Sequence, residues 1–254
     1  MNEIEKYYNK FNEDKRLSTR HGIVEFTISL EYIKKYLKKG GKVLDVGAGT
    51  GKYSISLAND GYDVTAVELV KKNLSVLKQN APTIPAYLGN ALNLKKFKDQ
   101  SFDAVILLGP MYHLHTNEDK FKALQEAKRV TKKGGVIFVA HLLSNYAIIR
   151  HGFMDQNITQ SIKNGKVDDN FNVISAEEDL YSYVTLQQIE QLNKKSNLER
   201  IEIISPDGPT DYIRPYVNKL TEEEFELYIN FVRKNANNFN SIGASSHLVD
   251  ILKV

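Results

Sequence analysis

Cysteine is absent from this sequence of 254 residues. Its absence excludes disulfide bonds, a thiolate nucleophile, and zinc or iron–sulfur sites built on cysteine. A strong charge of one sign is also lacking, because the net charge is only +3 and the basic residues are scattered along the chain. A protein that holds nucleic acid on a basic face carries a stronger positive balance. The composition therefore gives no support for a nucleic-acid partner.

Long hydrophobic runs are missing as well. The first 17 residues, MNEIEKYYNKFNEDKRL, are too charged to form the apolar region of a secretory signal. No apolar run approaches the length that spans a bilayer. The hydrophobic content of 42% and the charged content of 26% are ordinary for a globular domain. We therefore expect a cytoplasmic protein with no membrane partner, present as a monomer or a homodimer.

The first part of the chain alternates between two hydrophobic periods. A helical period runs from Ile23 to Leu37 and ends at two glycines. Short β-rich runs then alternate with helical segments. These runs lie at residues 42–46, 63–68, 84–89, 101–109 and 136–142. Such alternation predicts an α/β fold with a doubly wound parallel sheet.

The alternation stops after residue 142. Residues 143–184 contain short mixed segments, and we interpret them as an insertion over the active-site end of the sheet. A helix and a strand follow, and the last two strands are expected to pair antiparallel at one edge.

A glycine-rich loop follows the first strand in the stretch VLDVGAGTGKYS, residues 43–54. A phosphate-binding P-loop requires G-x-x-x-x-G-K-[ST]. Here the residue five positions before Gly51 is Val46, and Tyr53 follows Lys52. Both ends of the P-loop motif therefore fail.

The dinucleotide fingerprint G-x-G-x-x-G fails too. Gly47 and Gly49 fit its first two glycines, but the third position is Lys52. An acid nevertheless ends the second strand, about twenty residues on, where a carboxylate can accept both hydroxyls of a ribose. This acid is Glu68. The loop together with the spaced acid predicts a nucleotide-like ligand.

Ligands of open α/β sheets bind beyond the carboxyl ends of the strands. Asn90 follows the third strand, where its amide could reach an adenine edge. The residues from Leu108 to His113 follow the fourth strand, and we expect them to form one wall of the ligand cleft.

Together these motifs resemble class I S-adenosylmethionine (SAM)-dependent methyltransferases, in particular the branch that acts on small molecules. The matching stretches are VLDVGAGTG, AVEL, GNALNL, FDAVILLGPMYHL and KKGG, which follow one another in the family's order over residues 40–142. The resemblance implies a Rossmann-like sheet of seven strands in the order 3-2-1-4-5-7-6, with the last strand antiparallel. It also implies one domain, divided into an N-terminal lid (1–22), a SAM-binding core (23–142), an inserted cap (143–184) and the C-terminal part of the core (185–254).

The resemblance implies SAM as cofactor and S-adenosylhomocysteine (SAH) as its product. The methionine moiety would lie on the glycine loop, the ribose on Glu68, and the adenine beside the residues after the second and third strands. The implied cofactor-binding residues are Asp45, Gly47, Ala48, Gly49, Gly51, Glu68, Leu69, Asn90, Ala91, Leu92, Leu108 and Gly109. The chain departs from the family pattern at Asn90, where an aspartate is common.

Methyl transfer from a sulfonium requires mainly alignment of the acceptor and exclusion of water. A general base is needed only when the acceptor arrives protonated. His113 and Tyr112 are the candidates, with the alternatives that His113 is a hydrogen-bonded structural residue and that Tyr112 closes the end of the sheet. His141 could face the substrate or the insertion, and Asp207 could face the acceptor or simply belong to an Asp-Gly turn.

The N-terminal segment KYYNKFNEDKRL carries aromatic residues among its charges. In related methyltransferases the corresponding segment folds over the cofactor. Tyr8 and Arg16 are therefore candidates for contacting the methionine carboxylate or the acceptor. The alternative is an amphipathic helix that packs on the core.

The sequence predicts an enzyme that methylates a small molecule, with no metal ion. Adenine amino-methylation is disfavoured because Gly109 stands where an Asn or Asp precedes Pro-Pro-aromatic in those enzymes. Two other functions stay open. One is methylation of a tRNA wobble nucleotide, for which lysines near 34–42 and 71–78 would have to form one face. The other is a SAM-binding protein without catalysis.

Overall fold

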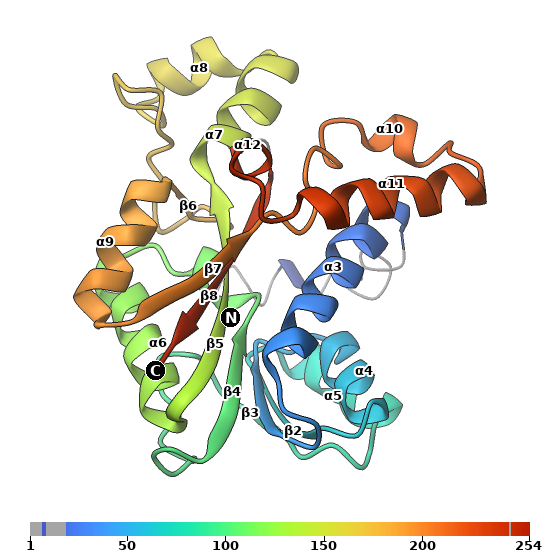
Figure 1. Ribbon diagram of the computed structural model, residues 1–254. Coiled ribbons are helices and arrows are strands. Elements are labelled where there is room, and N and C mark those ends of the chain that lie inside the picture. The colour runs from blue at the N-terminus through green and yellow to red at the C-terminus, as the bar shows by residue number, and fades with distance from the viewer. Residues whose placement is uncertain (1–6, 9–18, 244) are drawn as a thin grey trace.

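The computed structural model describes residues 7–8, 19–243 and 245–254. At its centre is an eight-stranded sheet in the order β3-β2-β1-β4-β5-β8-β7, with β6 pairing β5 outside this path (Figure 1). The strands are β1 (Lys42–Val46), β2 (Asp63–Glu68), β3 (Ala86–Leu88), β4 (Phe102–Leu107), β5 (Thr131–Leu143), β6 (Tyr183–Val184), β7 (Glu199–Ile204) and β8 (His247–Lys253).

The predicted sheet is confirmed. Strands β1 to β5 pair in parallel, whereas β8 runs antiparallel to both β5 and β7. Without β6, the order is the one that the family resemblance implied. The two-residue strand β6, parallel to the end of β5, is the addition.

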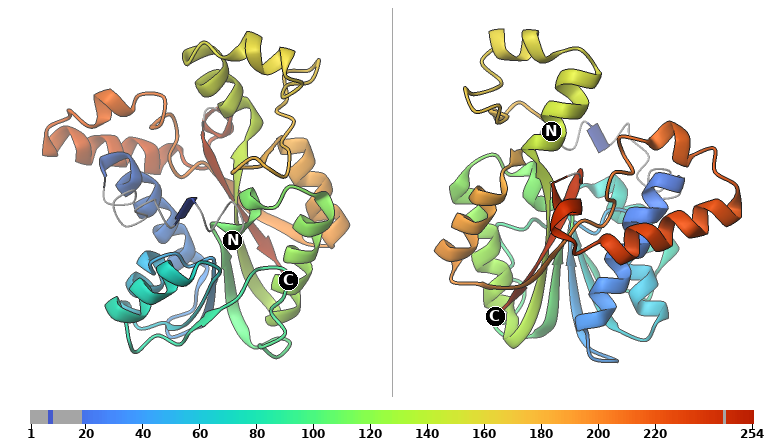
Figure 2. Two further views of the ribbon diagram at one scale, coloured as in Figure 1. Left: turned by 180° about the vertical axis from the view of Figure 1, so that it is seen from behind. Right: turned by 45° about the horizontal axis from the view of Figure 1, so that its top comes forward.

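Helices cover both faces of the sheet and give the molecule three layers (Figure 2). The helices are α3 (Arg20–Tyr36), α4 (Lys52–Asn59), α5 (Lys71–Asn80), η1 (Pro110–His113), α6 (Asn117–Val130), α7 (Ser144–Ala147), η2 (Ile148–Met154), α8 (Ile158–Lys163), α9 (Leu186–Ser196), α10 (Arg214–Val217), α11 (Glu222–Asn235) and α12 (Phe239–Ile242). Helices α3, α4, α5 and α11 contribute to the apolar core on one face, and α6 contributes to the core on the other.

Three helical segments lie beyond the carboxyl ends of the parallel strands. Helix α7 and the π-helix η2 continue directly from β5, and α8 follows them at the top of the molecule (Figure 1). These helices belong to residues 143–184, for which the sequence shows no regular alternation. In the described part of the chain, no helix is long and apolar enough to cross a membrane.

Three boundaries differ from the sequence prediction. Helix α3 begins at Arg20, because the side chain of Thr19 caps it by accepting from the Gly22 N–H. Strand β3 is confined to residues 86–88, where it pairs with β2. Strand β5 starts at Thr131, and its register with β4 shifts before Val136, so that residues 132–135 interrupt the pairing of the two strands.

Candidate active site

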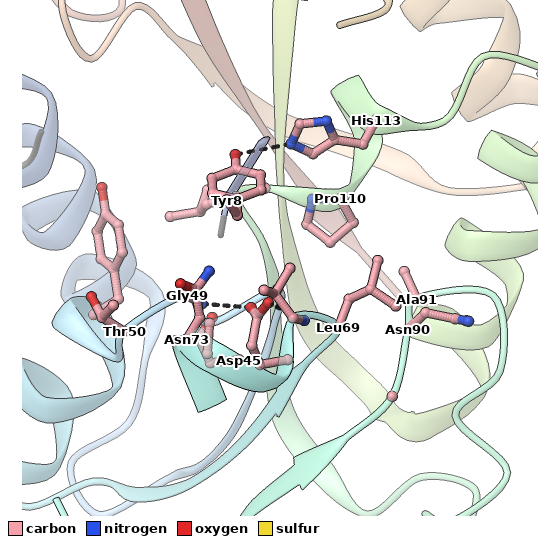
Figure 3. Close-up of a pocket in the computed structure, with 18 of the residues that line it drawn as sticks. Tyr8, Asp45, Gly49, Thr50, Leu69, Asn73, Asn90, Ala91, Pro110 and His113 are labelled. Atoms are coloured by element: carbon pink, nitrogen blue, oxygen red, sulfur yellow. Dashed lines mark hydrogen bonds between the residues drawn. The ribbon is translucent and has the colours of Figure 1, made fainter. Parts of the chain in front are cut away.

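A cavity of about 290 Å³ lies at the carboxyl ends of β1, β2 and β4 (Figure 3). Its floor is the glycine loop, and its sides come from the residues after β2, β3 and β4. Of the predicted cofactor-binding residues, Asp45, Gly47, Ala48, Gly49, Glu68, Leu69, Asn90, Ala91, Leu92, Leu108 and Gly109 line this cavity. The chain thus brings together residues that the linear motifs separate widely.

Two glycines of the loop are required for steric reasons. Gly47 has φ +78°, and a Cβ there would stand 2.8 Å from the ring of Pro110. Gly51 has φ +96°, and a Cβ there would stand 2.8 Å from Leu77 of α5. Gly51 is not among the residues that line the cavity, because it faces the packing between the start of α4 and α5. Its predicted contact with the cofactor stays a prediction.

The carboxylate of Glu68 is fixed at the end of β2. The side chain is 5% exposed. One of its oxygens accepts from the Gly49 N–H at 2.8 Å, and the other accepts from the Val70 N–H at 2.7 Å. These contacts tie the acid to the glycine loop and hold it against the cavity wall.

Asp45 lies beneath the same loop and is buried. Burial raises its pKa to about 6, although the hydroxyl of Ser54 donates to it at 2.6 Å and favours the ionised form. The nearby negative charge of Glu68 adds to the rise. The fold therefore maintains an acid at this position at the expense of stability.

The third region that was predicted to contact the cofactor follows β3. Asn90 Oδ1 accepts from the Leu92 N–H at 2.9 Å, so the side chain closes a local turn. Figure 3 shows Asn90 and Ala91 at one end of the cavity and Leu69 beside them. Since the carbonyl oxygen of Asn90 holds the turn, its amide NH₂ is the group available as a donor to a ligand.

The loop after β4 supplies Tyr112 and His113, the two candidates for catalysis. The hydroxyl of Tyr112 donates to the Leu108 carbonyl at 3.0 Å. His113 Nδ1 lies 2.9 Å from the Leu180 carbonyl. Because a carbonyl only accepts, Nδ1 carries the proton and Nε2 is the acceptor nitrogen.

Tyr8 contacts that acceptor nitrogen: its hydroxyl lies 3.1 Å from His113 Nε2 (Figure 3). Burial lowers the pKa of His113 to about 4, outweighing the hydrogen bond to Leu180. At neutral pH His113 is therefore an uncharged partner that joins Tyr8 to the wall of the cavity. Arg16, the other lid candidate, lies outside the described residues.

Two further candidates are placed elsewhere. His141 lies in β5, 2% exposed, and is not among the residues that line the cavity. Asp207 is also buried and does not line the cavity. Its carboxylate accepts from Ser245, Ser246 and His247. The roles suggested for these two residues, which concern the acceptor, stay predictions.

Sequence reasoning missed several residues of the wall. Thr50 and Asn73 line the cavity (Figure 3). Asn73 had a detectable signal, because its spacing from Val70 and Leu77 puts a polar residue on the apolar side of α5, where the structure leaves it 5% exposed. Tyr181 was also missed. It arrives from the insertion, and its ring lies 5.4 Å from that of His113 between centroids.

Comparison with known proteins identifies this architecture. Residues 44–139 match a family model described as a methyltransferase domain. Residues 44–139 carry a methyltransferase domain. The resemblance that the motifs indicated is thereby confirmed for this part of the chain.

Curated relatives match the methyltransferase domain over part of their length. The chain is 41% identical over 104 residues to a demethylmenaquinone methyltransferase of Paenarthrobacter aurescens, covering 41% of this chain and 40% of that protein. It is 45% identical over 101 residues to a demethylmenaquinone methyltransferase of Renibacterium salmoninarum, covering 40% of this chain and 41% of that protein. The chain thus matches well under half the length of these relatives.

Solved structures match the fold over nearly the whole chain. A SAM-dependent methyltransferase of Thermotoga maritima, described as a possible histamine N-methyltransferase, has a TM-score of 0.61 at 17% identity and covers 97% of each chain. A SAM-dependent methyltransferase of Methanosarcina mazei has a TM-score of 0.59 at 17% identity, covering 87% of this chain and 96% of that one. The methyltransferase domain therefore has the fold that its motifs imply.

Proposed function

We propose that this protein binds SAM in the cavity over β1, β2 and β4 and transfers the methyl group to a small-molecule acceptor. The observation that carries the proposal is the fixed carboxylate of Glu68, held against the cavity by the N–H groups of Gly49 and Val70. A carboxylate at the end of the second strand suits the paired hydroxyls of a ribose.

The other residues of the cavity fit the rest of SAM. The glycine loop offers close backbone approach to the methionine moiety, because Gly49 carries no side chain and has φ +57°. Asp45 offers negative charge for the ammonium group of that moiety. Leu69, Ala91 and Leu92 offer apolar contacts to the adenine ring, and the amide NH₂ of Asn90 offers a donor for a ring nitrogen.

SAM supplies a methyl group that is activated by its bond to a sulfonium. The protein has to orient the acceptor and exclude water. Tyr8 and Tyr112 suit this role, since both line the cavity and the ring of His113 lies against both of theirs. His113 suits positioning better than proton uptake, because its pKa of about 4 leaves it with little affinity for a proton.

A small-molecule acceptor is supported by the curated relatives, whose names specify demethylmenaquinone. Three of the lysines that an RNA substrate would need are engaged by acids. Lys34 lies 3.0 Å from Asp60, and Lys35 lies 2.8 Å from Glu202. Lys42 is also within ion-pair distance of a carboxylate. These pairs reduce the positive charge that the RNA alternative requires.

The test follows a labelled methyl group. The full chain is incubated with methyl-labelled SAM and either an extract of small metabolites or total tRNA, and the products are separated by size. We expect label in the small-molecule fraction, lost in Glu68→Ala and retained in Glu118→Ala, an exposed acid on α6. Label in tRNA would establish the RNA alternative. SAM binding without transfer to either pool would support the non-catalytic alternative.

A further inference from the structure

A buried carboxylate and a histidine meet beside the proposed methyl-transfer site, in a place that the cofactor does not require. Asp207 follows β7 and is 4% exposed. Its Oδ2 lies 2.9 Å from His247 Nδ1, and the hydroxyls of Ser245 and Ser246 also donate to its carboxylate. Four groups thus converge on one acid, counting the backbone N–H of His247 at 3.4 Å.

The topology brings this pair to the edge of the sheet where the cavity lies. His247 is the first residue of β8, and because β8 is antiparallel to β5, it pairs with Leu142 near the carboxyl end of β5. Asp207 lies just past the carboxyl end of β7. In the sheet order, β5 and β8 continue the edge beyond β4, so the pair lies on the side away from the proposed ribose and adenine sites.

An aromatic wall links the pair to the cavity. We define it as Tyr112, His113, Tyr181 and His247. The ring of Tyr112, which lines the cavity, lies 6.2 Å from that of His247, 5.0 Å from that of His113 and 5.9 Å from that of Tyr181 between centroids. These rings present edges and faces of the kind that pack against a planar aromatic molecule.

The two histidines of the aromatic wall lie in different electrostatic environments. His113 Nδ1 lies beside the neutral carbonyl of Leu180, and burial lowers the pKa of this imidazole to about 4. His247 Nδ1 faces the carboxylate of Asp207, and Asp211 adds a second negative charge nearby. A carboxylate at Nδ1 fixes the tautomer and stabilises the imidazolium that forms when Nε2 takes a proton. Of the two, His247 is therefore the one equipped to accept a proton.

Both acids near the wall already have partners. Asp207 is engaged by Ser245, Ser246 and His247, and Asp211 is engaged by Tyr146 and Arg214. An acceptor that pairs its ammonium group with either carboxylate would have to displace one of these contacts. A neutral hydroxyl on an aromatic ring requires no such exchange and needs a base to become a good nucleophile.

We infer that His247, oriented by Asp207, is the general base for an aromatic hydroxyl acceptor that binds against the aromatic wall. This inference rests on the proposed function. The acceptor O–H bond breaks and its proton moves to His247 Nε2, while the oxygen keeps the electron pair that attacks the methyl carbon. The new C–O bond replaces the C–S bond of SAM, the neutral thioether leaves, and the imidazolium later returns its proton to solvent.

The experiment uses 4-nitrophenol as a probe, because its phenolate absorbs visible light and its phenol does not. Full-length protein saturated with SAH is mixed with the probe at a pH below the probe's own titration range. We expect a bound phenolate band with the wild type and with His151→Gln, an exposed histidine used as a matched control. The band should be lost in His247→Gln and weakened in Asp207→Asn.

Rates give a second readout. With SAM, methyl transfer to 4-nitrophenol should fall by roughly 10²–10⁴-fold in His247→Gln, the usual contribution of a general base. SAH affinity measured by calorimetry should stay unchanged in that variant, which also shows that it folds.

Three results would overturn the inference. The first is wild-type protein that binds SAH but does not bind 4-nitrophenol. The second is wild-type protein that binds the probe with no phenolate band. The third is a His247→Gln variant that keeps the wild-type band and rate. Failure of the wild type to bind SAH at all would instead overturn the proposed function on which the inference rests.

Discussion

At the scale of single residues, the candidate site is built on groups that reduce stability. Asp45 is the clearest case, because burial raises its pKa from 3.8 to about 6. The native state therefore binds the proton of Asp45 more tightly than the unfolded chain does. The stability associated with this proton is fully present below the unfolded pKa and is lost as the pH rises through about 6.

Asp45→Asn should remove the loss of stability that the wild type shows as the pH rises through about 6. At pH 7.5 we expect the ligand-free variant to be more stable than the wild type by up to about 3 kcal/mol, since one pKa unit corresponds to ~1.4 kcal/mol. The gain should shrink as the pH is lowered from about 6 to 4. Urea unfolding of both proteins across this range measures it, with the exposed Asp63→Asn as control. An equal difference at every pH would contradict the assignment.

Residues close together in sequence were the easiest part of the site to predict. The glycines and Glu68 follow from motif spacing, and Asn90 follows from the strand before it. The pairing of Asp207 with His247 joins residues 40 positions apart through β7 and β8, and no local pattern encodes it. The packing of Gly51 could not be predicted, because the motif does not reveal that Leu77 would clash with a side chain there.

At the scale of elements, capping determines where several helices begin. Thr221 and Glu224 form a reciprocal capping box at the start of α11, in which each side chain accepts from the backbone N–H of the other residue. Helix α11 packs the buried side chains of Phe225 and Ile229 into the core on the α3 side of the sheet. The cap therefore stabilises an element on which that core depends.

Thr221→Ala should lower the free energy of unfolding by about 1 kcal/mol, the typical effect of losing an N-cap. Ser75→Ala is a suitable control, because Ser75 lies inside α5 and alanine is the better helix former there. The measurement is the urea concentration at the midpoint of unfolding, compared between the two variants at an unchanged m-value. A Thr221→Ala midpoint no lower than that of Ser75→Ala would show that the cap does not limit stability.

Elements with a strong hydrophobic period were predicted well. β1, β2 and β4 coincide with their predicted runs to within two residues, because all three are buried. The register shift at residues 132–135 was missed, since it depends on how β5 pairs with β4. The two-residue strand β6 was missed for the same kind of reason, because it exists only through its pairing with β5.

At the scale of the whole molecule, a buried ion pair joins the antiparallel edge of the sheet. Asp250 of β8 is fully buried. It accepts from two nitrogens of Arg200 in β7, at 2.7 and 3.0 Å, and from Asn193 of α9 at 2.6 Å. The order of the edge strands follows from such long-range contacts, which the sequence indicated only through the family resemblance.

Asp250→Ala should destabilise the protein by about 3–5 kcal/mol, because it leaves the charge of Arg200 without its buried partner. Glu190→Ala removes an exposed acid that contacts the same arginine at 3.6 Å, and it should cost no more than about 1 kcal/mol. Chemical unfolding of the two variants separates these effects. Equal losses of unfolding free energy in the two variants would contradict the importance of the buried pair.

The central claim, that the cavity binds SAM through Glu68 and the glycine loop, is tested most directly by calorimetry with SAH. The wild type and the control Glu118→Ala should bind in the micromolar range. Glu68→Ala should bind roughly 10- to 100-fold more weakly, as expected for lost hydrogen bonds to a charged group, and Gly49→Val should not bind measurably. No binding by the wild type, or equal binding by all four proteins, would contradict the claim.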